Sequence, residues 1–227
     1  MSTTTVQQSS AAAVMKRTKD CTNVHAVVPF LPFSTLSKKL LGPKPIESPR
    51  DNGCVSLIVE RPDINLRNIV NSTRLTVGGG MENSGWVERP EVGKKDQICV
   101  MSEAVIRAIT NGDDKDEWAA AGDNLFVDLD LGKHNLKVGD RVQVGDRVLL
   151  EVSSKPHTGC IKFSTRFGQD ALKAVSVPLA KERRLRGIYF FVVKGGEIKA
   201  GDKIKKLKPE LESEAGKETD ASQQEES

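Results

Sequence analysis

Short stretches of alternating or continuous apolar residues recur along the chain, and they predict a succession of β-strands. Residues 55–59, 74–77 and 97–101 are rich in β-branched and other apolar side chains, which is typical of strands. Residues 126–131 alternate apolar with acidic side chains, so they predict a strand with one face in water. Residues 187–193 are almost wholly apolar, and they predict a central strand buried on both faces.

Gly-Asp pairs mark turns in the second half of the chain. Residues 138–142 read Val-Gly-Asp-Arg-Val, residues 144–148 repeat that sequence, and residues 200–204 vary it. A Gly-Asp pair flanked by β-branched residues is a turn signal. Residues 141–144 and 148–152 are therefore predicted to form a β-hairpin.

Helical spacing of apolar residues is confined to short segments. This spacing predicts helices over residues 103–109, 113–121 and 169–175. The last strand is predicted over residues 203–207. Many short strands with frequent turns, few helices and no alternation of strands with helices predict a mainly β fold. The expected architecture is a closed or nearly closed antiparallel β-barrel.

The composition of the chain suggests three parts. Five prolines fall within residues 1–49, which predicts an N-terminal arm of largely irregular backbone. Residues 50–207 hold the predicted strands and form the expected barrel domain. Residues 208–227 carry seven acidic and two basic residues, a net charge of −5, so we expect an acidic disordered tail there.

Charge and cysteine usage narrow the classes of function. The net charge of +3 is too small to argue for nucleic acid as the main partner. The four cysteines include no Cys-x-x-Cys pair, and a reducing compartment is the simplest inference. No apolar run is long enough to predict a membrane span. Arg17 is the only arginine in the first twenty residues, so we expect a cytoplasmic protein, with a mitochondrial location as the alternative.

The stretch from Lys155 to Phe163 contains the most reactive arrangement of side chains. Cys160 lies there between the predicted hairpin and a short helix, with His157 before it and Lys162 and Arg166 after it. We predict that these cations, together with a protonated His157, lower the pKa of the thiol, because they stabilise the thiolate. A thiolate is both a nucleophile and a soft metal ligand. The alternative is a buried and inert cysteine.

In this region the sequence resembles the MOSC domain, the module named for the C-terminal part of molybdenum cofactor sulfurases. The resemblance covers roughly residues 53–207 and rests on the loop 122–125, the two Gly-Asp turns near 140 and 146, and the segments 157–160, 162–168, 185–189 and 200–202. It implies a β-barrel of the pyruvate-kinase-barrel-like type. It also implies that Cys160 matches the cysteine of the family that ligates molybdenum or carries sulfur as a persulfide.

The resemblance implies a molybdenum cofactor (molybdopterin) as the bound group. Short members of the family resemble oxidoreductases that reduce N-hydroxylated compounds. The predicted catalytic residues are Cys160 and His157, the predicted metal ligand is Cys160, and the predicted cofactor-binding residues are Asn124, Thr158, Lys162, Arg166 and Arg186. Asn124 has a second interpretation as a turn-capping side chain. Arg166 and Arg186 are alternatively ion-paired or surface residues.

Two departures from the family leave other functions open. Residues 80–86 lack the Gly-Asp and basic residue that we expect in the corresponding loop of the family. The chain also has no room for the pyridoxal-phosphate desulfurase domain of full sulfurases. One alternative function is a sulfur carrier that holds a persulfide on Cys160, and another is a non-catalytic cofactor-binding barrel. The expected partners are a small-molecule substrate and a separate electron-donor protein or cysteine desulfurase, without nucleic acid or a membrane span.

Overall fold

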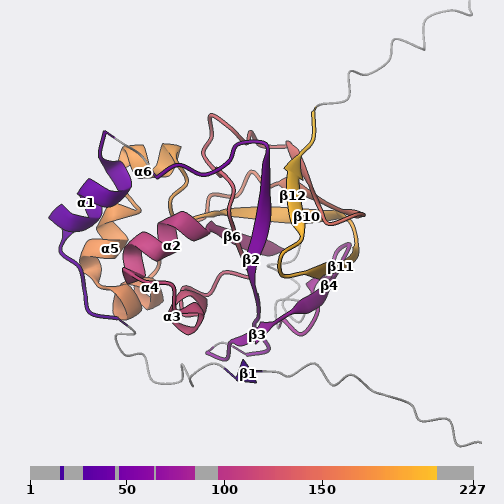
Figure 1. Cartoon of the computed structure of the whole chain (residues 1–227), viewed down its shortest axis with the longest axis horizontal. Helices are drawn as coiled ribbons and strands as arrows, with labels where there is room; N and C mark the ends of the chain where they lie inside the picture. Colours follow the sequence, from indigo (N-terminus) through magenta and orange to yellow (C-terminus); the bar gives the residue numbers. More distant parts are fainter. Residues whose placement is uncertain (1–15, 18–27, 44–45, 64, 85–96, 209–227) are drawn as a thin grey trace, which may run out of the picture.

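A computed structural model describes residues 16–17, 28–43, 46–63, 65–84 and 97–208, which form a β-barrel with a layer of helices on one side (Figure 1). The predicted acidic tail from residue 209, most of the N-terminal arm and the loop 85–96 lie outside the described residues. No helix of the described part is long and apolar enough to cross a membrane.

Within the described residues, seven strands close into a barrel because β2 pairs with both β12 and β7. In order around the barrel they are β2 (Asn52–Glu60), β12 (Lys203–Lys206), β8 (Arg141–Val144), β9 (Val148–Val152), β10 (Ile188–Lys194), β6 (Ile98–Ser102) and β7 (Leu125–Val127). The predicted hairpin is confirmed as β8 and β9, with Val144 opposite Val148 across the turn. The mainly β barrel predicted from the sequence is therefore confirmed.

The barrel is mixed rather than wholly antiparallel, which corrects the prediction from the sequence. Strands β6 and β7 run parallel, with Val100 opposite Leu125 and Ser102 opposite Val127. Two parallel neighbours cannot be joined by a tight turn. The chain connects them through a crossover that contains α2 (Glu103–Thr110) and α3 (Lys115–Ala119).

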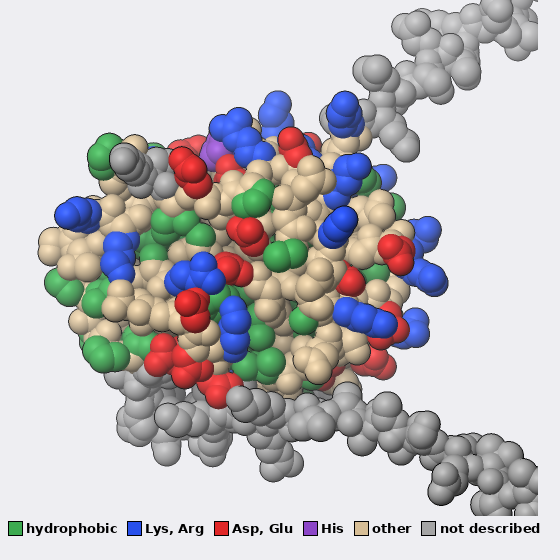
Figure 2. Space-filling view, viewed as in Figure 1, with side chains coloured by type: hydrophobic (Ala, Val, Ile, Leu, Met, Phe, Trp, Pro, Cys, Tyr) green, Lys and Arg blue, Asp and Glu red, His purple; other side chains and the backbone are tan. Residues whose placement is uncertain are grey.

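Shorter strands extend the barrel at its edges. A separate three-stranded sheet contains β4 (Ser72–Thr76), β5 (Gly80–Met81) and β11 (Gly196–Lys199), while β3 (Asn68–Val70) and β1 (Lys16–Arg17) continue the main sheet beyond β2. On the face shown in Figure 2, Lys and Arg side chains are interspersed with Asp and Glu rather than gathered by sign. Mixed charge of this kind is typical of a solvated surface.

The helical layer contains a helix that the sequence did not predict. Helix α1 (Phe33–Leu41) forms within the arm that was expected to be irregular. The prolines that suggested irregular backbone flank this helix, since Pro32 is its N-cap residue and Pro43 follows Gly42 at its end. The layer is completed by α4 (Ile161–Phe167), α5 (Gln169–Ala174) and α6 (Pro178–Glu182). Figure 1 shows α1, α5 and α6 together on the side of α2 away from the barrel.

The two layers have separate hydrophobic cores. The barrel interior is almost entirely aliphatic, with Phe190 as its aromatic ring among the described residues. The core beneath the helices contains four aromatic side chains, Trp118, Phe126, Phe163 and Phe167. Strand β10 alternates between buried and half-buried residues, so its predicted burial on both faces is wrong. The half-buried residues of β10 include Tyr189, which lies beside the candidate site described next.

Candidate functional site

The candidate site lies on the outer face of the barrel wall, where the wall meets the helical layer. Ile98 and Val100 of β6 pack inside the barrel, so the intervening Cys99 points outward by the alternation of a strand. Helix α4 packs in the helical layer through Phe163 and Phe167. Cys160 immediately precedes this helix and is exposed.

The backbone fixes Cys160 at the start of α4. Cys160 is the N-cap residue, with extended dihedral angles (φ −126°, ψ 174°). Its carbonyl oxygen accepts hydrogen bonds from the backbone N–H groups of Phe163 (3.0 Å) and Ser164 (3.2 Å). The preceding Gly159 allows a close approach to α5, because a Cβ atom there would lie 2.2 Å from Cδ1 of Leu172. The thiol is therefore exposed on a segment whose main chain is held in place.

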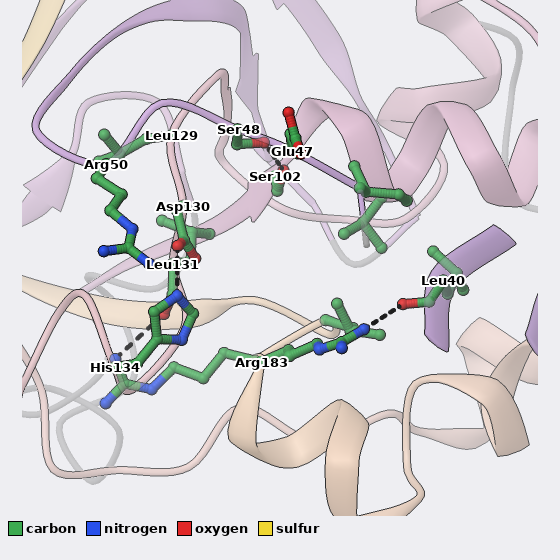
Figure 3. A pocket seen from close by; sticks show the side chains of 14 residues that line it. Leu40, Glu47, Ser48, Arg50, Ser102, Leu129, Asp130, Leu131, His134 and Arg183 are labelled. Carbon is green, nitrogen blue, oxygen red and sulfur yellow. Dashed lines mark hydrogen bonds and ion pairs between the residues drawn. The ribbon is translucent and has the colours of Figure 1, made fainter. Parts of the chain in front are cut away.

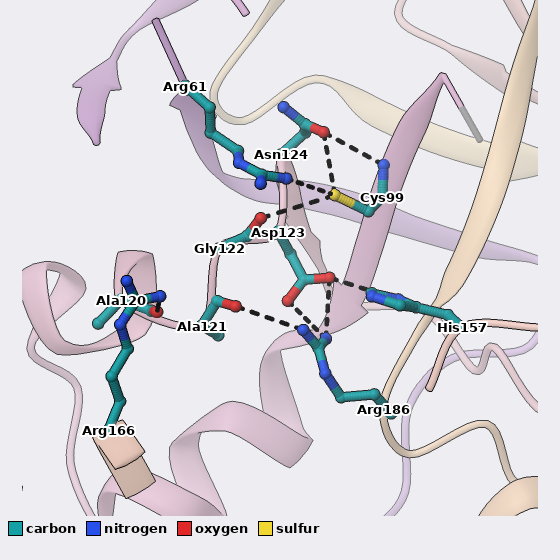
Figure 4. Close-up of polar contacts among 10 residues, drawn as sticks. All are labelled: Arg61, Cys99, Ala120, Ala121, Gly122, Asp123, Asn124, His157, Arg166 and Arg186. Atoms are coloured by element: carbon teal, nitrogen blue, oxygen red, sulfur yellow. Dashed lines mark hydrogen bonds and ion pairs between the residues drawn. The ribbon is translucent and has the colours of Figure 1, made fainter. Parts of the chain in front are cut away.

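The loop 120–124, which joins α3 to β7, organises the buried part of the site (Figure 4). Arg166 donates through Nη1 to the carbonyl oxygen of Ala120 at 2.8 Å. Arg186 donates through Nη2 to the carbonyl oxygen of Ala121 at 3.3 Å. Two guanidinium groups that are far apart in the sequence are thus held by successive carbonyl groups of one loop.

Asp123 is the central acid of this loop. Its side chain is fully buried and accepts two hydrogen bonds from Nη1 of Arg186, at 2.8 Å and 3.1 Å. Charge-assisted hydrogen bonds of this kind are among the strongest in proteins. The Asp123 carboxylate also lies 3.6 Å from Nδ1 of His157. Asp123 therefore connects two of the predicted site residues, although the sequence did not single it out as a site residue.

His157 is almost completely buried, with 6% of its side chain exposed. Its ring packs against Tyr189, with 4.3 Å between the ring centroids. Burial, and then the positive charges of Arg186, Arg61 and Lys155, hold the pKa of His157 well below its usual range. The imidazole is therefore neutral at neutral pH, which corrects the expectation of a protonated His157 beside the thiol. The effect of the remaining cations on the Cys160 thiol stays a prediction.

A second thiol lies in the site, and the sequence reasoning missed it. Cys99 is buried, and its Sγ atom lies 3.0 Å from Oδ1 of Asn124 and 3.6 Å from the carbonyl oxygen of Gly122. Arg61 donates to the same sulfur through Nη1 at 3.4 Å. Burial raises the pKa of the Cys99 thiol. Cys99 is thus a protonated, hydrogen-bonded thiol in the wall of the site.

Asn124 occupies a structural position. The residue is fully buried, and Oδ1 also accepts a hydrogen bond from the backbone N–H group of Cys99 at 3.3 Å. The Nδ2 group donates to the carbonyl oxygen of Val59 at 3.4 Å and lies 3.5 Å from the hydroxyl oxygen of Ser84. These contacts tie three segments of the wall together. The geometry therefore favours the structural interpretation of Asn124 over direct contact with a ligand.

Positive side chains gather near the exposed thiol. Burial and the charges of Arg166, Arg67 and Arg61 lower the pKa of Lys162, while the nearby Cys160 acts in the opposite direction. Arg67 is buried against Gly122, where a Cβ atom would lie 3.1 Å from Nη2 of Arg67. The structure thus places the predicted Lys162 near both Cys160 and Arg166.

The remaining site features concern Thr158 and metal ligation. Thr158 is exposed, two residues before Cys160. Among the described residues, no group of three or more His, Cys, Asp or Glu side chains could hold a metal ion.

Three site residues, Arg61, Cys99 and Asp123, were not predicted from the sequence, because their sequence signals are weak. Arg61 and Cys99 lie near the ends of strands, and Asp123 lies within the loop 122–125 that carries part of the family resemblance.

Comparison with known proteins identifies relatives by sequence model and by structure. The sequence model of the MOSC domain matches residues 88–205. The crystal structure of the YuaD protein from Bacillus subtilis matches with a TM-score of 0.52 and 15% sequence identity, covering 70% of this chain and 97% of that chain. The crystal structure of YiiM from Geobacillus stearothermophilus matches with a TM-score of 0.50 and 19% identity, covering 71% of this chain and 77% of that chain. No curated protein matches the chain.

Proposed function

The chain belongs to the MOSC domain family, and from this premise we propose that it binds the molybdenum cofactor beside Cys160 and acts there as an oxidoreductase. The family is consistent with a molybdenum-cofactor-binding domain. The observation that carries the proposal is an exposed thiol among positively charged side chains. A soft thiolate suits molybdenum, and the cations suit the phosphate of an anionic pterin.

The residues present fit this cofactor better than a metal ion held by protein side chains alone. The described residues offer no three-residue cluster of metal ligands, whereas Cys160 offers a single accessible sulfur. The molybdenum cofactor brings its own dithiolene sulfur ligands and needs few from the protein. In addition, Nε of Arg186 and Nδ1 of His157 are buried without a hydrogen-bond partner among the described atoms. Buried polar atoms in that state favour a site that is completed by a polar ligand or by water.

Each side chain has a defined role in the proposal. Cys160 would be the sulfur ligand, and Lys162, Arg166 and Arg186 would bind anionic groups of the cofactor. The loop 120–124 orients Arg166 and Arg186, so these guanidinium groups are positioned before any ligand arrives. Thr158 would contact the ligand from the exposed side. When bound, the cofactor supplies the redox chemistry for removing oxygen from an N-hydroxylated compound.

His157 is the candidate for proton transfer. Because its pKa lies well below the usual range, the neutral imidazole would hold a transferred proton only weakly and would pass it on readily. The Asp123 carboxylate at 3.6 Å would stabilise the imidazolium form during that transfer. Electrons would come from a separate donor protein. A small N-hydroxylated molecule is the proposed substrate class.

The second candidate function is sulfur transfer. The exposure of Cys160 favours it, because a persulfide carrier must present its sulfur to a cysteine desulfurase and to an acceptor. A non-catalytic cofactor-binding barrel is the third candidate function.

The cysteines bear on the proposed location. Cys54, Cys99 and Cys160 are free thiols, which suits a reducing compartment. We therefore propose a cytoplasmic location, with a mitochondrial location as the alternative.

The experiment that tests the proposal is production of the full chain in a host that supplies molybdenum cofactor. We expect purified protein to contain molybdenum and the fluorescence of oxidised pterin, and Cys160→Ser to lose the metal. Cys54→Ser is the matched control, since Cys54 is a free cysteine outside the site, and it should retain both. Retention of metal and pterin by Cys160→Ser would contradict the proposal. A mass increase of one sulfur on Cys160 of metal-free protein after incubation with a cysteine desulfurase would support sulfur transfer instead.

A further inference from the structure

A cavity lies away from the cysteine site, at the ends of β6 and β7. These parallel strands begin near Cys99 and Asn124 and end near Ser102 and Leu129. The cavity has a volume of about 500 Å³, within the range of small-molecule sites. Its lining comes from the end of α1, the segment 46–50, the loop 129–134 and the residues 183–185 that follow α6.

The apolar lining of this cavity is aliphatic. Among the described lining residues it consists of Leu40, Ile46, Val105, Leu129, Leu131 and Leu185. No aromatic ring among them offers a stacking surface, so a flat ring system has no specific partner here. Most of these side chains are already buried, so the apolar surface that faces the cavity is narrow and suits a slender hydrocarbon chain, which gains from its own burial.

Three arginines give the same cavity a positive polar side: Arg50, Arg183 and Arg184. Nη1 of Arg183 donates to the carbonyl oxygen of Leu40 at 3.1 Å, and Nη1 of Arg184 donates to that of Leu136 at 2.6 Å. Among the described residues, Arg50 and Arg183 form no ion pair with a carboxylate, whereas Arg184 interacts electrostatically with Asp140 and Glu182. A guanidinium group that donates only to neutral carbonyl oxygens retains donors for an anion.

The acidic residues of the cavity do not cancel this charge. Asp130 is already engaged, because Oδ2 lies 2.7 Å from Nε2 of His134 and Oδ1 accepts the backbone N–H of Gly132 at 2.9 Å. Glu47 is exposed. Figure 3 shows Arg50 and His134 on one side of the cavity, with Arg183 directed toward Leu40 on the other. Among the described lining residues, three arginines thus face a single unengaged carboxylate, that of Glu47, so the cavity keeps a positive charge.

We propose that this cavity is a binding site for an aliphatic carboxylate, with the hydrocarbon chain against the leucines and the carboxylate held by the lining arginines, Arg50 and Arg183 among them. The roof of the site, Leu40 and the segment 46–50, lies outside residues 88–205, the part matched by the MOSC domain. The site is therefore a feature that the N-terminal part of this chain adds to the barrel. It is independent of the function proposed for Cys160.

The test uses the full chain and decanoate, a medium-chain aliphatic carboxylate, in isothermal titration calorimetry. We expect saturable binding at one site per chain. Acetate, which lacks the hydrocarbon body, and decanol, which lacks the charge, should each bind at least about tenfold more weakly, because each removes one of the two contributions. Failure of decanoate to bind at its solubility limit would overturn the proposal.

Variants locate the binding. Arg50→Gln and Arg183→Gln should each weaken decanoate binding about tenfold, the effect of losing a charge-assisted hydrogen bond. Ser48→Trp, which fills the cavity, should abolish it. The control Arg74→Gln removes the same charge from an exposed arginine on β4 and should change nothing. Circular dichroism and thermal unfolding check the fold of each variant. If Ser48→Trp fails to fold, the two single variants Arg50→Gln and Arg183→Gln decide whether decanoate binds in this cavity. Binding that survives this pair but is lost in Lys162→Gln would place the carboxylate at the cysteine site and overturn the proposal.

Discussion

The cysteine site and the aliphatic cavity are both positively charged, but their cations are held in different ways. At the cysteine site, Arg186 forms two hydrogen bonds to a fully buried carboxylate, and Arg166 is buried against a carbonyl oxygen. At the cavity, Arg50 is exposed and Arg183 is half-buried. The first region is preorganised by a buried network, whereas the second can adapt its side chains to a ligand.

The difference between the two regions shows that positive charge alone can support binding of an anion but not a reaction. Positive side chains in either region attract an anion, but only the cysteine site combines them with an accessible thiol and a buried imidazole. Fixed dipoles and charges support chemistry because they need no rearrangement as a reaction proceeds. The described lining of the cavity contains no cysteine, and its imidazole, His134, is exposed and paired with Asp130, so the cavity suits binding rather than catalysis.

Neutralising one acid in each region should give the largest contrast. Asp123→Asn should lower the free energy of unfolding by about 3 kcal/mol, because it leaves the buried Arg186 without its charged partner. Asp130→Asn should cost less than about 1 kcal/mol, since its partner His134 is half exposed. Urea denaturation of both variants measures the difference. Equal small losses would mean that the buried network does not depend on Asp123.

The two thiols of the cysteine site should differ in reactivity by about two orders of magnitude or more, because Cys160 is exposed and Cys99 is buried with a raised pKa. Brief treatment of native protein with iodoacetamide, followed by peptide mass spectrometry, measures the two rates. Cys54, which is half-buried, serves as the internal reference. Rapid modification of Cys99 would show that the wall of the site opens readily.

The buried imidazole of the cysteine site should make the stability of the protein depend on pH. The folded-state pKa of His157 is depressed, so below about pH 6.5 the unfolded chain binds a proton that the folded chain does not. This contribution is complete above that pH and is lost as the pH falls, by up to about 1.4 kcal/mol per pH unit.

The measurement is the free energy of unfolding of wild type and His157→Gln between pH 5 and pH 7.5. We expect the slope to be smaller in His157→Gln than in wild type. Parallel curves for wild type and His157→Gln would contradict the neutral, buried imidazole described above.

Glycine substitutions should give the smallest contrast. Gly159→Ala places a Cβ atom 2.2 Å from Cδ1 of half-buried Leu172, so we expect a loss of about 1 to 2 kcal/mol. In Gly132→Ala the Cβ atom would lie 2.6 Å from Cε1 of the exposed His134, which can move, so the loss should stay below about 0.5 kcal/mol. If the clash between the added Cβ atom and Leu172 displaces the segment that carries Cys160, the thiol reactivity of Cys160 should change in Gly159→Ala. The double variant Gly159→Ala/Leu172→Ala, which removes the clash, should then recover it. Thermal unfolding and thiol labelling provide the two measurements.

Features of the fold that depend on local sequence were predicted well. The β8–β9 hairpin has its turn signal between its own strands, so its boundaries could be placed from the sequence. The parallel pairing of β6 with β7 was missed, because it joins segments separated by two helices and no local pattern specifies their direction. Helix α1 was missed because proline density outweighed the spacing of Leu36 and Leu40, which the structure buries.

The same distinction applies to the site. Cys160 could be chosen because basic residues and a histidine lie beside it in the sequence. Asp123 and Arg186 are 63 residues apart, and Arg61 and Cys99 are 38 apart, so their contacts exist only once the barrel has closed. The charge state predicted for His157 was wrong for a related reason: burial, which the sequence does not show directly, determines its pKa.

The parallel pair also limits how this protein can be redesigned. If the crossover through α2 and α3 were replaced by a tight turn, β7 would have to reverse its direction beside β6. Asn124 and the carbonyl groups of Ala120 and Ala121 would then be delivered to the far end of the strand, away from Cys99. Changes in crossover length at the exposed turn near Asn111 should be tolerated, while deletion of the crossover should dismantle the anchor points of both arginines.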